Sequence, residues 1–256
     1  MKMTGSVTKT AKSFVHFPLL FVLLLGGGFW VCYGIAVSNQ HVVLLPEWPF
    51  VSDTGTTPPE SCIFSLVLTW GAFAILITMY SYYKYVIQCD RQSKCNIASM
   101  IVGAVASFGV TMVGAFQWTN VLVPHLIGAA LAFFGAAIYS VMIVYISWNQ
   151  LVHKVHTRKV VYFRIAIVVV EVVSLIVMIA GGVLFQMDKK YLNIASGAEW
   201  ALIYAAIIFV GTLAYDLRHV KGATVLLQIR NIESPSIPLG GVDTTYASTR
   251  VLTKEP

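Results

Sequence analysis

The stretch Pro49–Ser65, PFVSDTGTTPPESCIFS, is the longest segment in the first two hundred residues that a lipid bilayer would reject. It carries Asp53 and Glu60 but no Lys or Arg, and long apolar runs lie on both sides of it. An ordered loop is predicted, because Asp53 can bond backbone amides ahead of it, Gly55 permits positive φ, and two prolines stiffen the exit. Glu60 and Ser61 then stand where the first turn of a helix prefers acceptors and negative charge.

The composition around this loop is that of a membrane protein. Of the 256 residues, 57% are hydrophobic and only 11% are charged, and the mean hydropathy is +0.77. A soluble domain would carry about a quarter charged residues. The chain is therefore predicted to be an all-α polytopic membrane protein. Its net charge of +6 has a membrane explanation before a nucleic-acid one, so no nucleic-acid partner is expected.

Six apolar runs are long enough to cross a bilayer as helices. All but two of the 17 Lys and Arg residues lie in the N-terminal segment, in the loops after the second and fourth runs, and in the C-terminal tail. The positive-inside rule therefore predicts a six-helix bundle with both termini in the cytosol and the large loop in the lumen or outside the cell. The expected segments are a cytosolic N-terminus at 1–13, spans at about 14–37, 62–83, 97–116, 123–147, 165–185 and 195–215, a luminal loop at 38–61, and a partly disordered cytosolic tail at 217–256.

The run SDTGTTPPES, Ser52–Ser61, closely resembles the signature loop of the DRAM (damage-regulated autophagy modulator) family, within the wider Frag/DRAM/Sfk group of six-span proteins. That group also includes plasma-membrane regulators of phosphoinositide synthesis and a Golgi factor for GPI-anchor remodelling. Further positions look like family positions: Phe116-Gln117, His125, Glu199-Trp200 and Tyr215-Asp216-Leu217.

The resemblance implies a six-span fold without enzymatic activity and a role in autophagy or lysosomal function. The expected partners are membrane lipids and proteins of the autophagy or phosphoinositide machinery. A lysosomal or endosomal membrane is the expected location, with the plasma membrane or Golgi as alternatives. Regulation of phosphoinositide synthesis, and an ion channel or transporter, are the alternative functions.

Several polar residues are expected at the outer ends of the spans. If spans two, four and six cluster there, these residues can share one pocket for a lipid headgroup, a cation or a proton. The alternative is that they cap helix starts and hold the loop in place, because first-turn acids interact favourably with the helix dipole. The residues of this candidate site are Asp53, Glu60, Gln117, His125, Glu199 and Trp200.

The sequence offers no pattern for catalysis. There is no H-E-x-x-H for zinc and no G-x-S-x-G around a serine, so no catalytic residue, metal or cofactor is predicted. Glu171 falls near the middle of span five, where a charge is costly. Glu171 therefore has two interpretations. It is part of an ion or proton path, which in a channel requires a ring of such groups and hence a homo-oligomer, or it is a lone polar group bonded to a neighbouring span.

The loop after span four is the most basic part of the chain. It is expected either to contact anionic cytosolic lipids or simply to determine topology. Cys89 and Cys95, in the basic cytosolic loop after span two, are candidates for palmitoylation. A disulfide between Cys32 and Cys62 is possible. The candidate lipid contacts in the basic loop are Lys154, Arg158, Lys159 and Arg164.

Overall fold

The structure is a computed structural model that describes residues 14–43, 46–89, 93–152, 157–218 and 220. The expectations for 1–13, for the tail from 221 onward and for Lys154 therefore lie outside the described residues. Six α-helices and two short 3₁₀ helices form the described part. They are α1 (His16–Ser38), η1 (Ser52–Gly55), α2 (Glu60–Cys89), α3 (Lys94–Ala115), α4 (Leu122–Val152), α5 (Arg158–Phe185), η2 (Lys189–Tyr191) and α6 (Leu192–Leu217).

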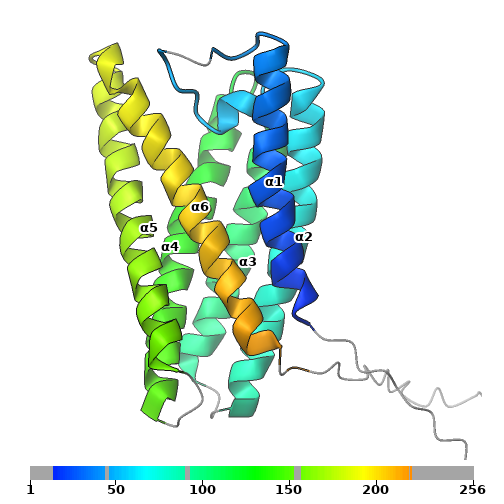
Figure 1. Ribbon diagram of the computed structural model, residues 1–256, viewed down its shortest axis with the longest axis vertical. Coiled ribbons are helices and arrows are strands. Elements are labelled where there is room, and N and C mark those ends of the chain that lie inside the picture. Colours follow the sequence, from blue (N-terminus) through cyan, green and yellow to red (C-terminus); the bar gives the residue numbers. More distant parts are fainter. Residues whose placement is uncertain (1–13, 44–45, 90–92, 153–156, 219, 221–256) are drawn as a thin grey trace, which may run out of the picture. The chain divides into compact units, whose positions relative to one another are not determined.

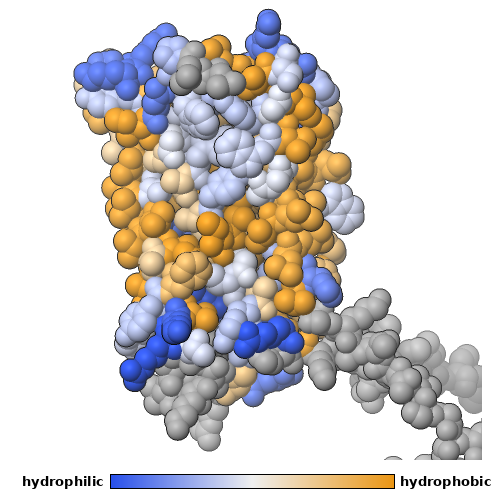
Figure 2. Space-filling model, in the orientation of Figure 1, coloured by the Kyte–Doolittle hydropathy of each residue, from blue (hydrophilic) through white to orange (hydrophobic). Residues whose placement is uncertain are grey.

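All six α-helices are long and apolar enough to cross a membrane. The shortest, α3, has 22 residues, and a helix of about 20 residues spans the ~30 Å apolar core of a bilayer. α1 begins and α6 ends at the same end of the bundle, called here the terminal end, whereas η1 lies at the opposite loop end (Figure 1). Apolar residues form a band between two hydrophilic ends in Figure 2. The prediction of an all-α fold with six long apolar helices is confirmed.

Small residues allow the helices to pack closely. A Cβ on Gly109 of α3 would lie 2.6 Å from the backbone nitrogen of Ala132 and 2.6 Å from the carbonyl oxygen of Gly128, both on α4. A Cβ on Gly181 of α5 would lie 3.1 Å from the backbone of Ala195 on α6. These backbones touch without intervening side chains, as is common between helices in a membrane.

One basic residue expected at the membrane surface is buried instead. Arg164 is 0% exposed and forms an ion pair with Asp216 of α6. Its guanidinium also donates to Ser147 Oγ at 2.9 Å and to Thr212 Oγ1 at 2.9 Å. The expectation that Arg164 contacts anionic lipid was wrong, because α5 begins at Arg158 rather than near 165 and places Arg164 inside the bundle. Arg158 and Lys159 are exposed.

The two outer cysteines are not bridged. Cys32 is buried, Cys62 is exposed, and both are free thiols. The Cys32 thiol lies 3.7 Å from the backbone oxygen of Glu60. Cys62, two residues further along α2, is directed away from the buried face on which Cys32 lies.

Candidate functional site

The loop between α1 and α2 contains a tight turn. The Phe50 amide donates to Asp53 Oδ2 at 2.8 Å, and the Thr54 hydroxyl donates to the Val51 carbonyl at 2.7 Å. Asp53 therefore bonds the amide three residues before it rather than amides ahead of it. These two hydrogen bonds close the turn that contains η1.

Gly55 allows close packing of this loop because it has no side chain. No glycine in the described residues has positive φ, so the expected left-handed conformation at Gly55 was wrong. A Cβ at Gly55 would lie 2.4 Å from the ring of Phe64 on α2, far inside van der Waals contact. The missing side chain lets the loop backbone lie directly on the α2 aromatic ring.

α6 holds the loop from the other side. The Val51 amide donates to Glu199 Oε2 at 2.6 Å, and the Trp200 indole donates to the Pro49 carbonyl at 3.0 Å. The pattern explains why both polar side chains are buried, at 7% exposure each: each satisfies a loop backbone group that would otherwise be unpaired. Asn193, which the sequence analysis did not single out, adds a bond from its amide to Pro46 O (2.8 Å) and one from the Trp48 amide to its own oxygen (2.7 Å).

Glu60 ties the end of α1 to the start of α2. It is 0% exposed, accepts a hydrogen bond from Asn39 Nδ2 at 3.4 Å, and pairs with Nδ1 of His41. The His41 side chain is 29% exposed. Asn39 and His41 were not among the predicted site residues, because nothing in their spacing shows that they return to Glu60.

His125 and Gln117 organise the turn between α3 and α4. His125 Nδ1 lies 2.7 Å from the Phe116 carbonyl oxygen. A carbonyl can only accept, so Nδ1 carries the proton. Gln117 Oε1 accepts from Asn120 within the turn. Both residues therefore stabilise the turn that connects the two helices.

The predicted site residues do not converge on one pocket. Glu199 and His125 line a central cavity of the bundle. Asp53 lines an outer groove together with His41, Trp48 and Trp118, and Glu60 lines neither. Their contacts fit the alternative interpretation, in which these residues hold the loop and the helix ends in place.

Burial raises the pKa of the Asp53 carboxyl above its ordinary value, against the lowering effect of hydrogen bonds from the Phe50 amide and the Trp118 side chain. Desolvation disfavours the charged form of an acid. The folded loop therefore binds a proton at Asp53 more readily than the unfolded chain does.

An aromatic cluster joins α1, the loop and α6. The ring centroids of Tyr33 and Trp48 are 5.6 Å apart, those of Tyr33 and Trp200 6.0 Å, and those of Trp48 and Trp200 6.1 Å. Trp30 joins the cluster 5.1 Å from Trp200 and is half exposed. Such pairs stabilise by about 0.5–1.5 kcal/mol each beyond area burial, so the cluster reinforces the loop's hydrogen bonds.

Glu171 lies inside the bundle with 0% exposure. Its Oε1 accepts a hydrogen bond from Ser140 Oγ of α4 at 3.3 Å. This is the contact expected of a polar group bonded to a neighbouring span.

Six long apolar helices with a folded polar loop anchored at one end define a multi-pass helical membrane protein. Residues 13–220 match the family profile described as the Frag1/DRAM/Sfk1/Cwh43P N-terminal domain. The chain belongs to this family.

Named relatives cover most of the chain. It is 31% identical to human DNA damage-regulated autophagy modulator protein 1, over 79% of this chain and 90% of the relative. It is 30% identical to the Xenopus laevis Modulator of macroautophagy TMEM150B-A, over 80% of this chain and 86% of the relative. It is 27% identical to Xenopus laevis Transmembrane protein 150A, over 85% of this chain and 89% of the relative. No solved structure matches the chain significantly.

Proposed function

We propose that this chain is a non-enzymatic membrane protein of lysosomes or endosomes that modulates autophagy through lipid and protein partners. The observation that carries the proposal is the family match over residues 13–220, because relatives that align with about four fifths of this chain are named as autophagy modulators.

The loop end supplies a prearranged surface for a partner in the lumen. Its backbone is held by Glu199, Trp200 and Asn193, while Glu47 and Pro58 remain exposed. A surface that is already ordered loses little conformational entropy when it binds. The loop is therefore suited to recognise a partner without refolding.

The terminal end supplies a cationic surface for the cytosol. Arg158 and Lys159 are exposed at the start of α5, and each Lys or Arg near an anionic leaflet contributes about 1 kcal/mol to lipid attraction. The buried Arg164 does not belong to this surface.

The proposal is tested by removing the protein from cells and measuring autophagic flux, as turnover of a lipidated autophagosome marker with and without block of lysosomal acidification. Re-expressed wild-type protein is expected to restore flux and to colocalise with endolysosomal markers. Trp200→Ala, which releases the loop at Pro49, is expected to localise correctly but restore flux poorly. Trp70→Ala is the matched control, because Trp70 is 56% exposed on the outside of α2.

Unchanged flux after loss of the protein, together with absence from endolysosomal membranes, would contradict the proposal. Impermeant labelling of the loop at the surface of intact cells would instead place the protein in the plasma membrane.

A further inference from the structure

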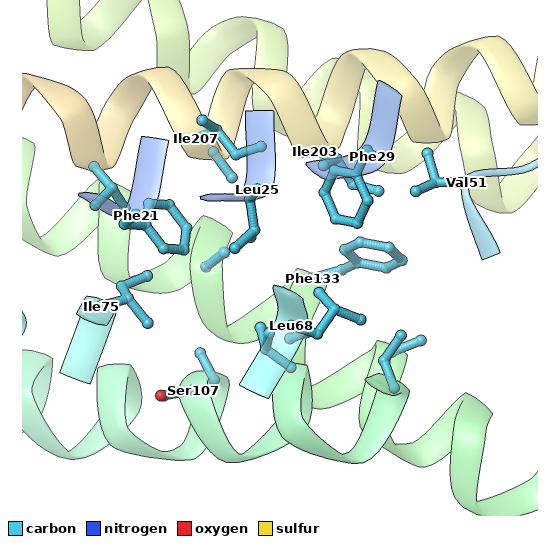
Figure 3. A pocket seen from close by; sticks show the side chains of 18 of the residues that line it. Phe21, Leu25, Phe29, Val51, Leu68, Ile75, Ser107, Phe133, Ile203 and Ile207 are labelled. Atoms are coloured by element: carbon cyan, nitrogen blue, oxygen red, sulfur yellow. The ribbon is translucent and has the colours of Figure 1, made fainter. Parts of the chain in front are cut away.

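The six-helix bundle contains a central, partly open cavity of about 110 Å³, and Val51 and Ser52 of the loop contribute to its lining. This is several times the ~10–15 Å³ that one water molecule needs. In Figure 3, Val51 and Phe29 lie toward one end of the cavity and Phe21 and Ile75 toward the other, with Leu25 and Leu68 between them. Most of the lining is apolar.

Two buried polar groups in the wall of this cavity lack hydrogen-bond partners. They are Oε2 of Glu171 and the hydroxyl of Tyr139, and both residues line the cavity. Glu171 is 0% exposed and Tyr139 is 2% exposed. A buried polar group without a partner destabilises a fold, so each of these two groups is available to a molecule bound in the cavity.

The two groups come from two helices that pack against each other, α4 and α5. Tyr139 directly precedes Ser140, whose hydroxyl donates to the other oxygen of Glu171. One group is an acceptor and the other can donate. A hydroxyl is suited to both, because it donates to a carboxyl oxygen and accepts from a phenol.

Between this polar point and the loop end, the cavity wall is mostly apolar, and the hydroxyl of Ser107, which also lines it, donates to the Ala72 carbonyl. His125 and Ser140 lie 15 positions apart on α4, which corresponds to about 22 Å of helix. The cavity residues of α4 between them are Ala129, Ala132, Phe133 and Ala136. An ion or proton path would require further polar groups along this distance, whereas a long apolar molecule fits it.

The same residues explain why there is space. Ala129, Ala132 and Ala136 recur at helical spacing on one face of α4, so that face offers methyl groups rather than long side chains. Ala206 of α6 also lines the cavity. The short side chains on this face of α4 thus leave room for the cavity.

We propose that the central cavity binds a neutral lipid alcohol, with its hydroxyl at Glu171 and Tyr139 and its apolar body along the alanine face of α4. A membrane sterol and a diacylglycerol share this chemistry. Val51 and Glu199, which form a loop contact, line the same cavity, but the proposed contacts of the hydroxyl lie at Glu171 and Tyr139, and the proposal does not depend on a role in autophagy.

The test uses the purified full-length chain in lipid nanodiscs and two photoreactive probes with free hydroxyls, a sterol and a diacylglycerol. One of the two is expected to label the chain saturably, on peptides of α4 or α5. Excess of the same unlabelled lipid competes, whereas its hydroxyl-blocked derivative (sterol methyl ether or acetylated diacylglycerol) competes about tenfold more weakly, as for one lost hydrogen bond to an acidic group.

Variants test the cavity itself. Ala136→Leu fills the cavity and is expected to reduce saturable labelling about tenfold or more, equivalent to ~1.4 kcal/mol or more of lost affinity. Ala130→Leu is the matched control: Ala130 lies on the exposed side of α4, and labelling should stay within about twofold of wild type.

Labelling by neither probe, or equal labelling of Ala136→Leu and wild type, would overturn the proposal. Equal competition by the blocked derivative would also overturn it, because the hydroxyl would then make no contact. The competition experiment uses the wild-type chain, so it decides the matter even if Ala136→Leu does not fold.

Discussion

Arg164 on α5 and Asp216 on α6 form an ion pair in which the two side chains are 0% and 1% exposed. Ser147 of α4 and Thr212 of α6 complete the hydrogen bonding of the guanidinium. Three helices therefore meet at one arginine near the terminal end. Removing both charges from water is costly, and the pair is tolerated because nearly every donor has a partner.

Arg164→Ala is expected to destabilise the bundle by about 3–5 kcal/mol, because it removes the positive charge that neutralises the buried Asp216 carboxylate. Arg164→Lys should also be clearly destabilising, since an ammonium cannot reproduce the guanidinium fork. The measurement is thermal unfolding of the purified protein in detergent. Lys159→Ala, at an exposed position of the same helix, is expected to unfold like wild type.

Replacing both Arg164 and Asp216 distinguishes the contribution of their charges to stability from the contribution of their packing. Arg164→Met with Asp216→Leu should recover much of the stability that Arg164→Ala loses, because no unpaired charge remains. If the double variant were as unstable as the single one, packing rather than charge would determine the effect.

Gly55→Ala is expected to loosen the outer loop. The new methyl would lie 2.4 Å from the Phe64 ring, and overpacking of this kind typically costs about 1–3 kcal/mol. Limited proteolysis of the loop should be faster than in wild type. The control is Gly34→Ala in α1, where nothing lies within 4 Å of the new Cβ; equal protection of both variants would show that the loop can move away from Phe64 at little cost.

The pH dependence of loop stability has a predicted sign at Asp53. Burial raises the pKa of this carboxyl in the folded chain. Protonation of Asp53 therefore contributes stability to the folded loop. This contribution is fully present below the unfolded pKa of about 3.9 and is lost as the pH rises through the folded pKa. The loop should resist proteolysis better in acidic medium than in neutral medium, with each medium tested by a protease that is active in it.

Asp53→Asn should remove this part of the pH dependence, seen as a flatter dependence of thermal stability between about pH 4 and pH 7. Asp188→Asn is an informative control, because hydrogen bonds from Lys190 lower the pKa of Asp188. Its contribution to stability therefore changes only below about pH 4, and the slope between about pH 4 and pH 7 should stay that of wild type. A slope unchanged by Asp53→Asn would show that other groups of the loop end determine it.

The helices could be predicted from sequence because each is a long apolar run, and the bilayer requires such runs to be helical. The loop's partners could not. Glu199 and Val51 are 148 positions apart, and no local pattern pairs a side chain with a particular distant amide. Arg164 was misplaced for a related reason: a basic residue near a span end usually determines topology, and only the three-dimensional pairing with Asp216 shows that this one is buried.

Orientation in the membrane is the last prediction. The basic residues at the terminal end predict that this end faces the cytosol. Thr119→Cys lies in the turn just before α4, and Asn149→Cys lies near the C-terminal end of α4, so the two thiols stand at opposite ends of the bundle, both at exposed positions. In sealed vesicles with the cytosolic face outward, an impermeant maleimide should label Asn149→Cys above the wild-type level at once, and Thr119→Cys only after permeabilisation. The reverse order would place the loop in the cytosol, and the raised pKa of the Asp53 carboxyl would then make the stability of the loop respond to cytosolic pH.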